Sequence, residues 1–121
     1  MSLIDKQKEV DDWVQQFTPP YWPALEKMAR LTEEVGELAR EINHLYGTKK
    51  KKKASEPSGI PSEEGKDKKE LAGELIDVIF TIICIANDEN INLEKAWQRM
   101  VEEKMKKRDI NRFERKDDFS S

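Results

Sequence analysis

The segment that decides the fold is residues 31–47, LTEEVGELAREINHLYG, in which apolar residues recur at every third or fourth position. The same spacing begins slightly upstream and includes Leu25, Met28, Leu31, Val35, Leu38, Ile42 and Leu45. This pattern predicts one amphipathic α-helix of several turns. Pro23 suits its first turn, and Gly47 suits its C-terminal cap.

The polar side of this predicted helix is strongly acidic. It carries Glu33, Glu34, Glu37 and Glu41, with only Arg40 interleaved as a basic residue. Like charges three or four positions apart on a helix repel each other by roughly 0.2–0.5 kcal/mol per pair. Glu34, Glu37 and Glu41 share one face, and Glu33 lies at its edge. Such a cluster calls for a compensating charge.

Three further helices are predicted, over residues 3–17, over about residues 68–88, and after an N-cap at Asn92. The third helix contains VIFTIICI, which is also typical of a strand, but the length of the flanking periodic pattern favours a helix. Its circumference is apolar almost all round, so we expect burial on nearly all sides. Residues 48–69 are rich in Lys, Ser, Pro and Gly and predict a flexible loop, and the tail from Asp109, except Phe113, should be loose.

These features predict a single all-α domain of residues 1–121, a bundle of about four helices whose core is completed in a homodimer or a homotetramer. The net charge of −3 argues mildly against a nucleic-acid partner. The longest apolar run, residues 78–86, is too short to span a membrane. The single cysteine, Cys84, is interpreted as a small buried hydrophobic residue in a reducing cytosol, which predicts a cytoplasmic protein.

Asp77 is the most informative acid, because it interrupts LIDVIF where a buried helix should carry an aliphatic residue. Burying a carboxylate without a partner costs several kcal/mol. A basic partner, protonation or a bound cation would each compensate it. No Lys or Arg lies in residues 70–88, so a hard cation such as Mg²⁺ held between two helices is the preferred interpretation. For Glu41, a solvated helix face is the better interpretation.

Other metal and nucleophile chemistries lack the necessary residues. Glu41 and His44 form one Glu-x-x-His motif, but His44 is the only histidine, and a di-iron site of the ferritin type needs two such motifs. Zinc sites also require more His or Cys. His44 is therefore interpreted as a surface residue near a helix end, and no triad with Cys84 is indicated.

The combination of EEVGELA and, after a loop, ELIDVIF resembles the MazG-like nucleotide pyrophosphohydrolases over about residues 22–108. That family carries Glu-Glu-x-x-Glu on one helix and Glu-x-x-Asp on the next, which correspond here to Glu33, Glu34, Glu37, Glu74 and Asp77. The resemblance implies an all-α fold completed by oligomerisation. It also implies Mg²⁺-dependent cleavage of nucleoside triphosphates to a monophosphate and pyrophosphate, with Mn²⁺ as a substitute ion and a role in clearing the nucleotide pool.

The resemblance further implies a role for each residue of the site. The expected metal ligands are Glu34, Glu37, Glu74 and Asp77. Glu33 would hold a second ion or orient the attacking water, and Lys104 and Arg108 of the last helix would approach the phosphates. Many members carry Asn two positions before this lysine, whereas this chain has Glu102.

Aromatic residues precede the acidic helix in the stretch WVQQFTPPYWP, residues 13–23. Trp13 and Phe17 are interpreted as core residues of the first helix. Tyr21 and Trp22, beside prolines, are expected to line a pocket for the nucleobase. Two alternatives stay open at this point: a non-catalytic helical module whose acids bind a structural cation or a protein partner, and an enzyme that acts on a modified nucleotide.

Overall fold

The computed structural model describes residues 2–47 and 64–116, and every regular element among them is helical. The elements are α1 Leu3–Val14, α2 Ala24–Tyr46, α3 Glu64–Asp88, α4 Leu93–Met100 and a π-helix Val101–Arg108. The predicted all-α class and the four α-helices are confirmed. Of the predicted loop, residues 48–63 lie outside the described residues, and α3 begins at Glu64 rather than near Lys68.

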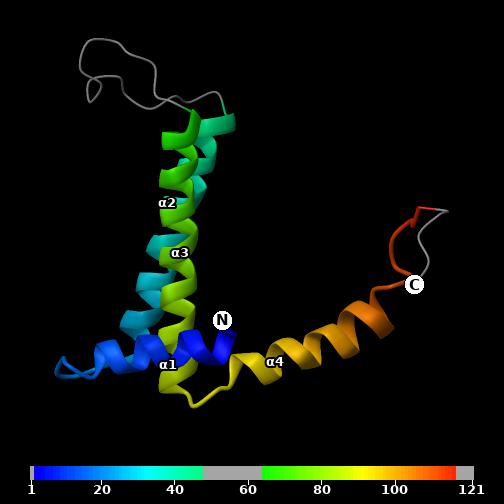
Figure 1. The fold of residues 1–121 in the computed structure, drawn as a ribbon. Coiled ribbons are helices and arrows are strands. Elements are labelled where there is room, and N and C mark those ends of the chain that lie inside the picture. Colours follow the sequence, from blue (N-terminus) through cyan, green and yellow to red (C-terminus); the bar gives the residue numbers. More distant parts are fainter. Residues whose placement is uncertain (1, 48–63, 117–121) are drawn as a thin grey trace, which may run out of the picture.

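Helices α2 and α3 form a long antiparallel pair that dominates the described structure (Figure 1). Helix α1 crosses this pair at the end where α2 begins and α3 finishes. From the same end, α4 and the π-helix run away from the pair to one side. Among the described residues, no helix is both long enough and apolar enough to cross a membrane.

Helix α1 begins with a capping box and ends earlier than its apolar pattern predicts. The backbone N–H of Asp5 donates to Ser2 Oγ at 3.3 Å, and the Ser2 N–H donates back to Asp5 Oδ2 at 3.2 Å. The Ser2 backbone N–H lowers the pKa of the Asp5 carboxyl. The helix stops at Val14 instead of Phe17. A helical backbone is disfavoured at Thr18, because the next residue is proline.

The predicted C-cap of α2 is confirmed at Gly47, whereas Pro23, predicted in the first turn, is the N-cap residue directly before it. Gly47 is extended, with φ −89°, and therefore does not use the left-handed conformation common at this position. A Cβ atom built on Gly47 would lie 2.0 Å from Asn43 Oδ1 and 2.6 Å from the Asn43 carbonyl oxygen. Close approach of the last helical turn is thus the reason for glycine here.

One buried side chain, Gln7 of α1, fixes the turn between α3 and α4. Its Nε2 donates to Asn87 Oδ1 at 3.0 Å and to the Ile91 carbonyl at 2.8 Å, while its Oε1 accepts from the Leu93 N–H at 2.8 Å. In return, Asn87 Nδ2 donates to the Gln7 carbonyl at 2.9 Å. Every polar group of the Gln7 side chain is used, so the direction in which α4 leaves α3 is set by this residue.

The apolar surface of α3 is only partly covered within one chain. The fully buried apolar residues of the described structure are few: Val14, Ile83 and Ala86. By contrast, α3 exposes Leu75, Ile76, Ile79, Phe80 and Ile82, by 38–60% each. The expectation that α3 is buried on nearly all sides is therefore wrong for the single chain, because α2 and α1 cover one side of it and leave an apolar face open.

The last helix has the predicted start but an unexpected geometry. Asn92 is its N-cap, and its side-chain oxygen accepts from the Lys95 N–H at 3.1 Å. After Met100 the chain continues as a π-helix, whose wider hydrogen bonding is seen where the Asp109 N–H donates to the Lys104 carbonyl at 2.6 Å. Such segments are rare and often lie at functional sites. In the tail that follows, Phe113 is 74% exposed, so its ring packs little against the described part of the chain.

Candidate functional site

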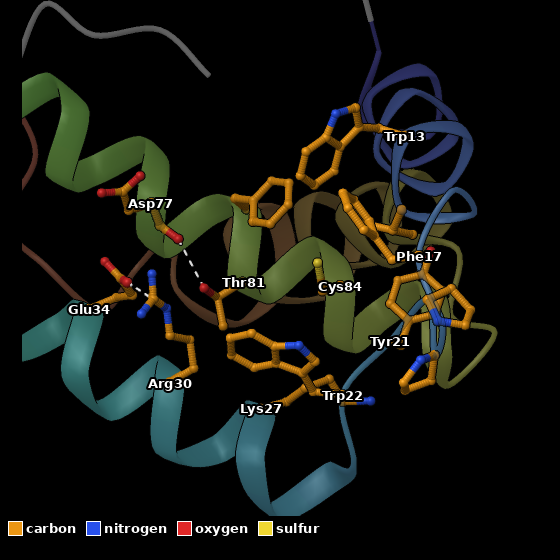
Figure 2. A pocket seen from close by; sticks show the side chains of 14 residues that line it. Trp13, Phe17, Tyr21, Trp22, Lys27, Arg30, Glu34, Asp77, Thr81 and Cys84 are labelled. Atoms are coloured by element: carbon orange, nitrogen blue, oxygen red, sulfur yellow. Dashed lines mark hydrogen bonds and ion pairs between the residues drawn. The ribbon is translucent and has the colours of Figure 1, made fainter.

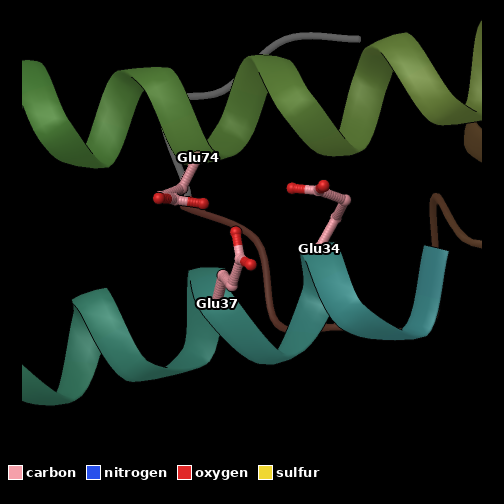
Figure 3. Close-up of side chains that lie close together, drawn as sticks. All are labelled: Glu34, Glu37 and Glu74. Atoms are coloured by element: carbon pink, nitrogen blue, oxygen red, sulfur yellow. The ribbon is translucent and has the colours of Figure 1, made fainter. Parts of the chain in front are cut away.

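Three of the predicted acids meet between α2 and α3. One carboxylate oxygen from each of Glu34, Glu37 and Glu74 lies within 4.8 Å of the other two. Figure 3 shows the three side chains pointing into the space between the two helices. The antiparallel pairing produces this meeting, because residues three or four apart on a helix share one face. Glu34 is only 2% exposed and is the most deeply buried of the three.

The environment of these acids opposes their ionisation. Burial raises the pKa of Glu34. The Arg30 guanidinium lowers this pKa and so offsets part of the increase, whereas the negative charges of Glu37 and Asp77 raise it further. Burial likewise raises the pKa of Glu74, and the negative charge of Glu37 adds to the effect. Glu34 Oε2 and Glu74 Oε2 are buried, and neither has a hydrogen-bond partner within the described part of the chain. Buried carboxylate oxygens without partners fit a hard divalent cation, which prefers oxygen ligands.

Arg30 is a functional residue that the sequence interpretation missed. Its Nε donates to Glu34 Oε1 at 2.8 Å, and its Nη1 lies 3.7 Å from Glu33 Oε2. The sequence analysis considered a basic partner only for Asp77, on the third helix, whereas Arg30 pairs with Glu34 from the turn of α2 that precedes it. The spacing of four positions between Arg30 and Glu34 was the available signal.

The burial of two other acids differs from the prediction. Asp77 is exposed rather than buried, because it lies beyond Glu74 at the edge of the helix pair, on the rim of a pocket. Glu41, interpreted as solvated, is only 9% exposed, since it lies two turns along α2 from Glu34 on the face that packs against α3. His44 is half-buried rather than a surface residue. Glu33 is exposed, as its place at the edge of the acidic face implies.

A pocket of about 390 Å³ opens directly beside the acids. Its aromatic and proline side is formed by Trp13, Phe17, Pro19, Pro20, Tyr21, Trp22 and Phe80. Its other lining residues are Val14, Lys27, Arg30, Glu34, Asp77, Thr81 and Cys84. Figure 2 shows Glu34 and Asp77 at one end and the labelled aromatic rings gathered toward the other. Such a pocket accommodates a flat apolar group next to a charged one.

Two aromatic residues were assigned wrongly from the sequence. Trp13 is 54% and Phe17 48% exposed, so they line the pocket instead of a core. Their rings are in edge-to-face contact, with ring centroids 5.0 Å apart. The ring of Trp13 also makes an edge-to-face contact with Phe80, with ring centroids 6.1 Å apart. The predicted pocket residues Tyr21 and Trp22 do line it. Because α1 crosses the helix pair, its apolar side faces this pocket.

The polar groups around the pocket have defined partners. Tyr21 Oη donates to Asp11 Oδ1 at 2.5 Å, and burial together with this bond raises the pKa of Tyr21 to about 12. Thr81 Oγ1 donates to the Asp77 carbonyl at 3.0 Å. Cys84 is half-buried, not fully buried as expected, and desolvation raises the pKa of its thiol. The pocket therefore keeps both the phenol and the thiol protonated at neutral pH.

The predicted phosphate-binding residues lie elsewhere in the same chain. Lys104 and Arg108 belong to the π-helix, which runs away from the α2–α3 pair (Figure 1). Arg108 Nε donates to Asp109 Oδ1 at 3.0 Å, an exposed pair of neighbouring residues. One chain therefore brings together the acids and the aromatic residues of the predicted site, but it leaves these two cations apart from them.

Comparisons with known proteins identify the family of this chain. Residues 24–113 match the family model for the MazG nucleotide pyrophosphohydrolase domain. The chain is 45% identical over 117 residues to YpjD of Bacillus subtilis (strain 168), covering 97% of this chain and 95% of that protein. The crystal structure of YpjD from B. subtilis superimposes with a TM-score of 0.67 and 42% identity over 83% of this chain and 91% of the other.

A second solved structure, the Bacillus-conserved MazG protein, a nucleotide pyrophosphohydrolase, superimposes with a TM-score of 0.64 and 43% identity. The alignment covers 87% of this chain and 90% of that one. The resemblance noted in the sequence is thus confirmed by the family match, the relative and the fold. The chain belongs to the MazG nucleotide pyrophosphohydrolase family, and is accordingly a hydrolase.

Proposed function

We propose that the protein is a Mg²⁺-dependent nucleoside triphosphate pyrophosphohydrolase that releases a nucleoside monophosphate and pyrophosphate. The observation that supports this most directly is the acid cluster that opens onto an aromatic pocket. Glu34, Glu37, Glu74 and Asp77 would hold the metal. When bound, Mg²⁺ (or Mn²⁺ in its place) neutralises phosphate charge and lowers the pKa of a bound water.

The chain's own groups have separate tasks in this reaction. Glu33 lies beside the cluster and accepts a proton from, or orients, the water that attacks the phosphorus. Arg30 holds the Glu34 carboxylate through its 2.8 Å bond, so that this ligand is oriented before substrate arrives. The aromatic side of the pocket stacks on the base and excludes water from it.

The phosphate-binding cations Lys104 and Arg108 are proposed to come from a second copy of the chain. The apolar face of α3 is exposed in the single chain, and the π-helix that carries these cations extends away from the acids of the same chain. A homodimer, or a homotetramer made of two dimers, would bury the apolar face of α3 and bring the cations of one chain to the acids of another.

Glu102, at the position where many family members carry Asn, places a carboxylate within hydrogen-bonding distance of Lys106, at 3.2 Å.

A product assay with a nucleotide panel tests this function. Common and modified nucleoside triphosphates are incubated with the protein, with and without Mg²⁺, and monophosphate and pyrophosphate are quantified. We expect equimolar amounts of the two products, only with the metal. Release of inorganic phosphate instead, or products that are insensitive to a chelator, would contradict the proposal. The non-catalytic alternative is set aside, because the chain belongs to a family of hydrolases.

The raised pKa values of the buried acids predict a pH-dependent effect of Mg²⁺ on stability. Above the ordinary value of 4.5, the folded protein keeps protons on Glu34 and Glu74 that the unfolded chain has lost. The free energy of unfolding therefore falls as pH rises from 4.5 through the raised pKa values. Metal replaces these protons. At a metal concentration of about 100 times Kd, stability should increase by about 2.7 kcal/mol.

Thermal melts check this expectation. We expect the increase in melting temperature on adding Mg²⁺ to be several degrees at about pH 8 and much smaller near pH 5. The variant Glu34→Gln should lose most of this pH-dependent difference, because one of the two titrating ligands is gone. An equal effect of Mg²⁺ at both pH values would contradict binding at these acids.

The role of the pocket aromatics predicts a change in substrate affinity. Stacking of a base on an aromatic side chain contributes about 1–3 kcal/mol, so Trp13→Ala or Trp22→Ala should raise KM by about 5- to 150-fold. Turnover should change less, since neither residue approaches the phosphates. Phe113→Ala, in the exposed tail, is the matched control. Steady-state kinetics of pyrophosphate release give both constants, and an unchanged KM in both tryptophan variants would place the base elsewhere.

A further inference from the structure

A buried cation lies at the end of the pocket away from the acids. The side chain of Lys27, in the first turn of α2, is only 5% exposed, and its Nζ donates to the carboxylate of Asp88 at the end of α3. Pairing is needed because an unpaired buried ammonium is costly. Lys27 lines the pocket, whereas Asp88 does not. A ligand that fills this end therefore lies against the Lys27 side chain.

The distance from Lys27 to the acids matches a nucleotide. Lys27 and Glu34 lie on the same face of α2, two turns apart, which corresponds to about 10 Å along the helix axis. Both residues line the same pocket, and Arg30 lies between them. Phosphates held at the Glu34 end therefore leave the far edge of the base near Lys27, between the rings of the aromatic side.

Among the lining residues that the structure describes, the one charged hydrogen-bonding group at this end is a donor. An ammonium has three N–H donors and no acceptor, and Asp88 occupies one of them in the described structure. The hydroxyls of Tyr21 and Thr81 donate their protons to Asp11 and to the Asp77 carbonyl, so toward a ligand they offer only neutral acceptor lone pairs. Lys27 is thus the one strongly charged donor facing the base end among the described lining residues.

We propose that Lys27 makes the pocket selective for oxo-substituted bases over their amino counterparts. The carbonyl farthest from the sugar, at position 6 of a purine or position 4 of a pyrimidine, accepts a hydrogen bond from the Lys27 ammonium. An amino group at the same position is itself a donor, cannot accept from the ammonium, and brings its own partial positive charge against that of Lys27, which disfavours it. Hypoxanthine and guanine are therefore preferred over adenine, and uracil over cytosine. The inference rests on the proposed function, because it requires a nucleotide in this pocket.

Binding can be measured without catalysis, because Cys84 is the only cysteine of the chain and lines the pocket. The probes are deoxyinosine and deoxyadenosine monophosphate, and deoxyuridine and deoxycytidine monophosphate. Each is titrated for protection of Cys84 against a thiol reagent, at alkaline pH because burial raises the pKa of the thiol. We expect half-protection at about tenfold lower concentration of the oxo member of each pair.

Three variants decide whether Lys27 causes the preference. Lys27→Met keeps the length of the side chain but removes its charge. In this variant, both nucleotides of a pair should protect Cys84 equally, whereas in Lys27→Arg the oxo nucleotide should still protect at lower concentration. Lys8→Met, exposed on α1, should behave as wild type. Circular dichroism checks the fold of each. A preference that persists in Lys27→Met overturns the proposal, and so does equal or absent protection in the wild type, whether or not the methionine variant folds.

The same samples separate this proposal from the proposed function. Selective protection by the monophosphates, without pyrophosphate release from any triphosphate, would support base recognition by Lys27 and contradict the enzymatic proposal. Pyrophosphate release together with equal protection by oxo and amino bases would overturn the role of Lys27 and leave the enzymatic proposal standing.

Discussion

Glu34→Gln is expected to lower pyrophosphate release by at least about 100-fold, more than any other single change to the chain. Glu34 is the most buried of the three acids that meet between α2 and α3, and its Oε2 is one of the buried oxygens without a hydrogen-bond partner in the described structure. Glutamine keeps the shape but removes the charge that a divalent cation requires. Activity at saturating Mg²⁺ is the measurement.

The fold of this variant should survive. Because burial raises the pKa of Glu34, its ionisation opposes folding near neutral pH, and the neutral amide should raise the melting temperature of the metal-free protein. Glu89→Gln, which removes an exposed acid after α3, is the control and should change neither quantity. A folded Glu34→Gln protein with full activity would contradict a catalytic role for the acid cluster. Asp77→Asn, at the rim, should also lose most of its activity.

Two inactive variants are expected to restore activity when they are combined. If Lys104 and Arg108 serve the acids of a second copy, then Glu34→Gln chains and Lys104→Ala/Arg108→Ala chains form mixed dimers in which one of two sites is intact. Random pairing of equal amounts gives mixed dimers in half of the cases, and hence about a quarter of the wild-type activity for a symmetric dimer. Pyrophosphate release after co-expression of the two variants is the measurement.

The pairing of Glu34→Gln with Glu74→Gln is the control for this experiment. Both acids belong to a cluster built within one chain, so every site of a mixed dimer carries one defect and no activity should return. Recovery in neither combination would place the cations and the acids in the same chain. Light scattering that shows a monomer at micromolar concentration would also remove the basis for sharing.

The helix pair that carries the acids was predictable from the spacing of a few residues. Apolar residues at every third or fourth position predict α2, and the same period places Glu34 and Glu37 together on one face. The side that packs on α3 was not predicted, because it carries the buried Lys27, Glu34 and Glu41, whereas the apolar Leu25, Met28 and Val35 are 47–84% exposed. A motif on a second helix, which includes Glu74, then requires only that the helices lie side by side. Fold class and the meeting of the acids follow from this local geometry, whereas the family was inferred from the resemblance of the two motifs.

The surroundings of the site were not predictable, because they depend on how separate helices cross. Periodicity shows that Trp13 lies on the apolar side of α1, but it does not show that this side faces a pocket. Likewise, an aliphatic setting suggested that Asp77 is buried, whereas its exposure depends on which side of α3 the other helices leave open to the pocket. The spacing of Val101 and Met105 fits an α-helix, so the apolar pattern does not indicate the π-helix that the structure shows there.

The hydrogen bonds of Gln7 at the turn between α3 and α4 have a consequence for sequence variation in this family. Gln7 and Asn87 exchange bonds in both directions, and Gln7 also reaches the Ile91 carbonyl and the Leu93 N–H on the far side of the turn. Losing either amide alone leaves buried polar groups without partners, at a cost of about 1–3 kcal/mol each. Substitutions at positions 7 and 87 should therefore be inherited together among relatives. A natural chain that differs at only one of them should leave α3 for α4 at a different angle.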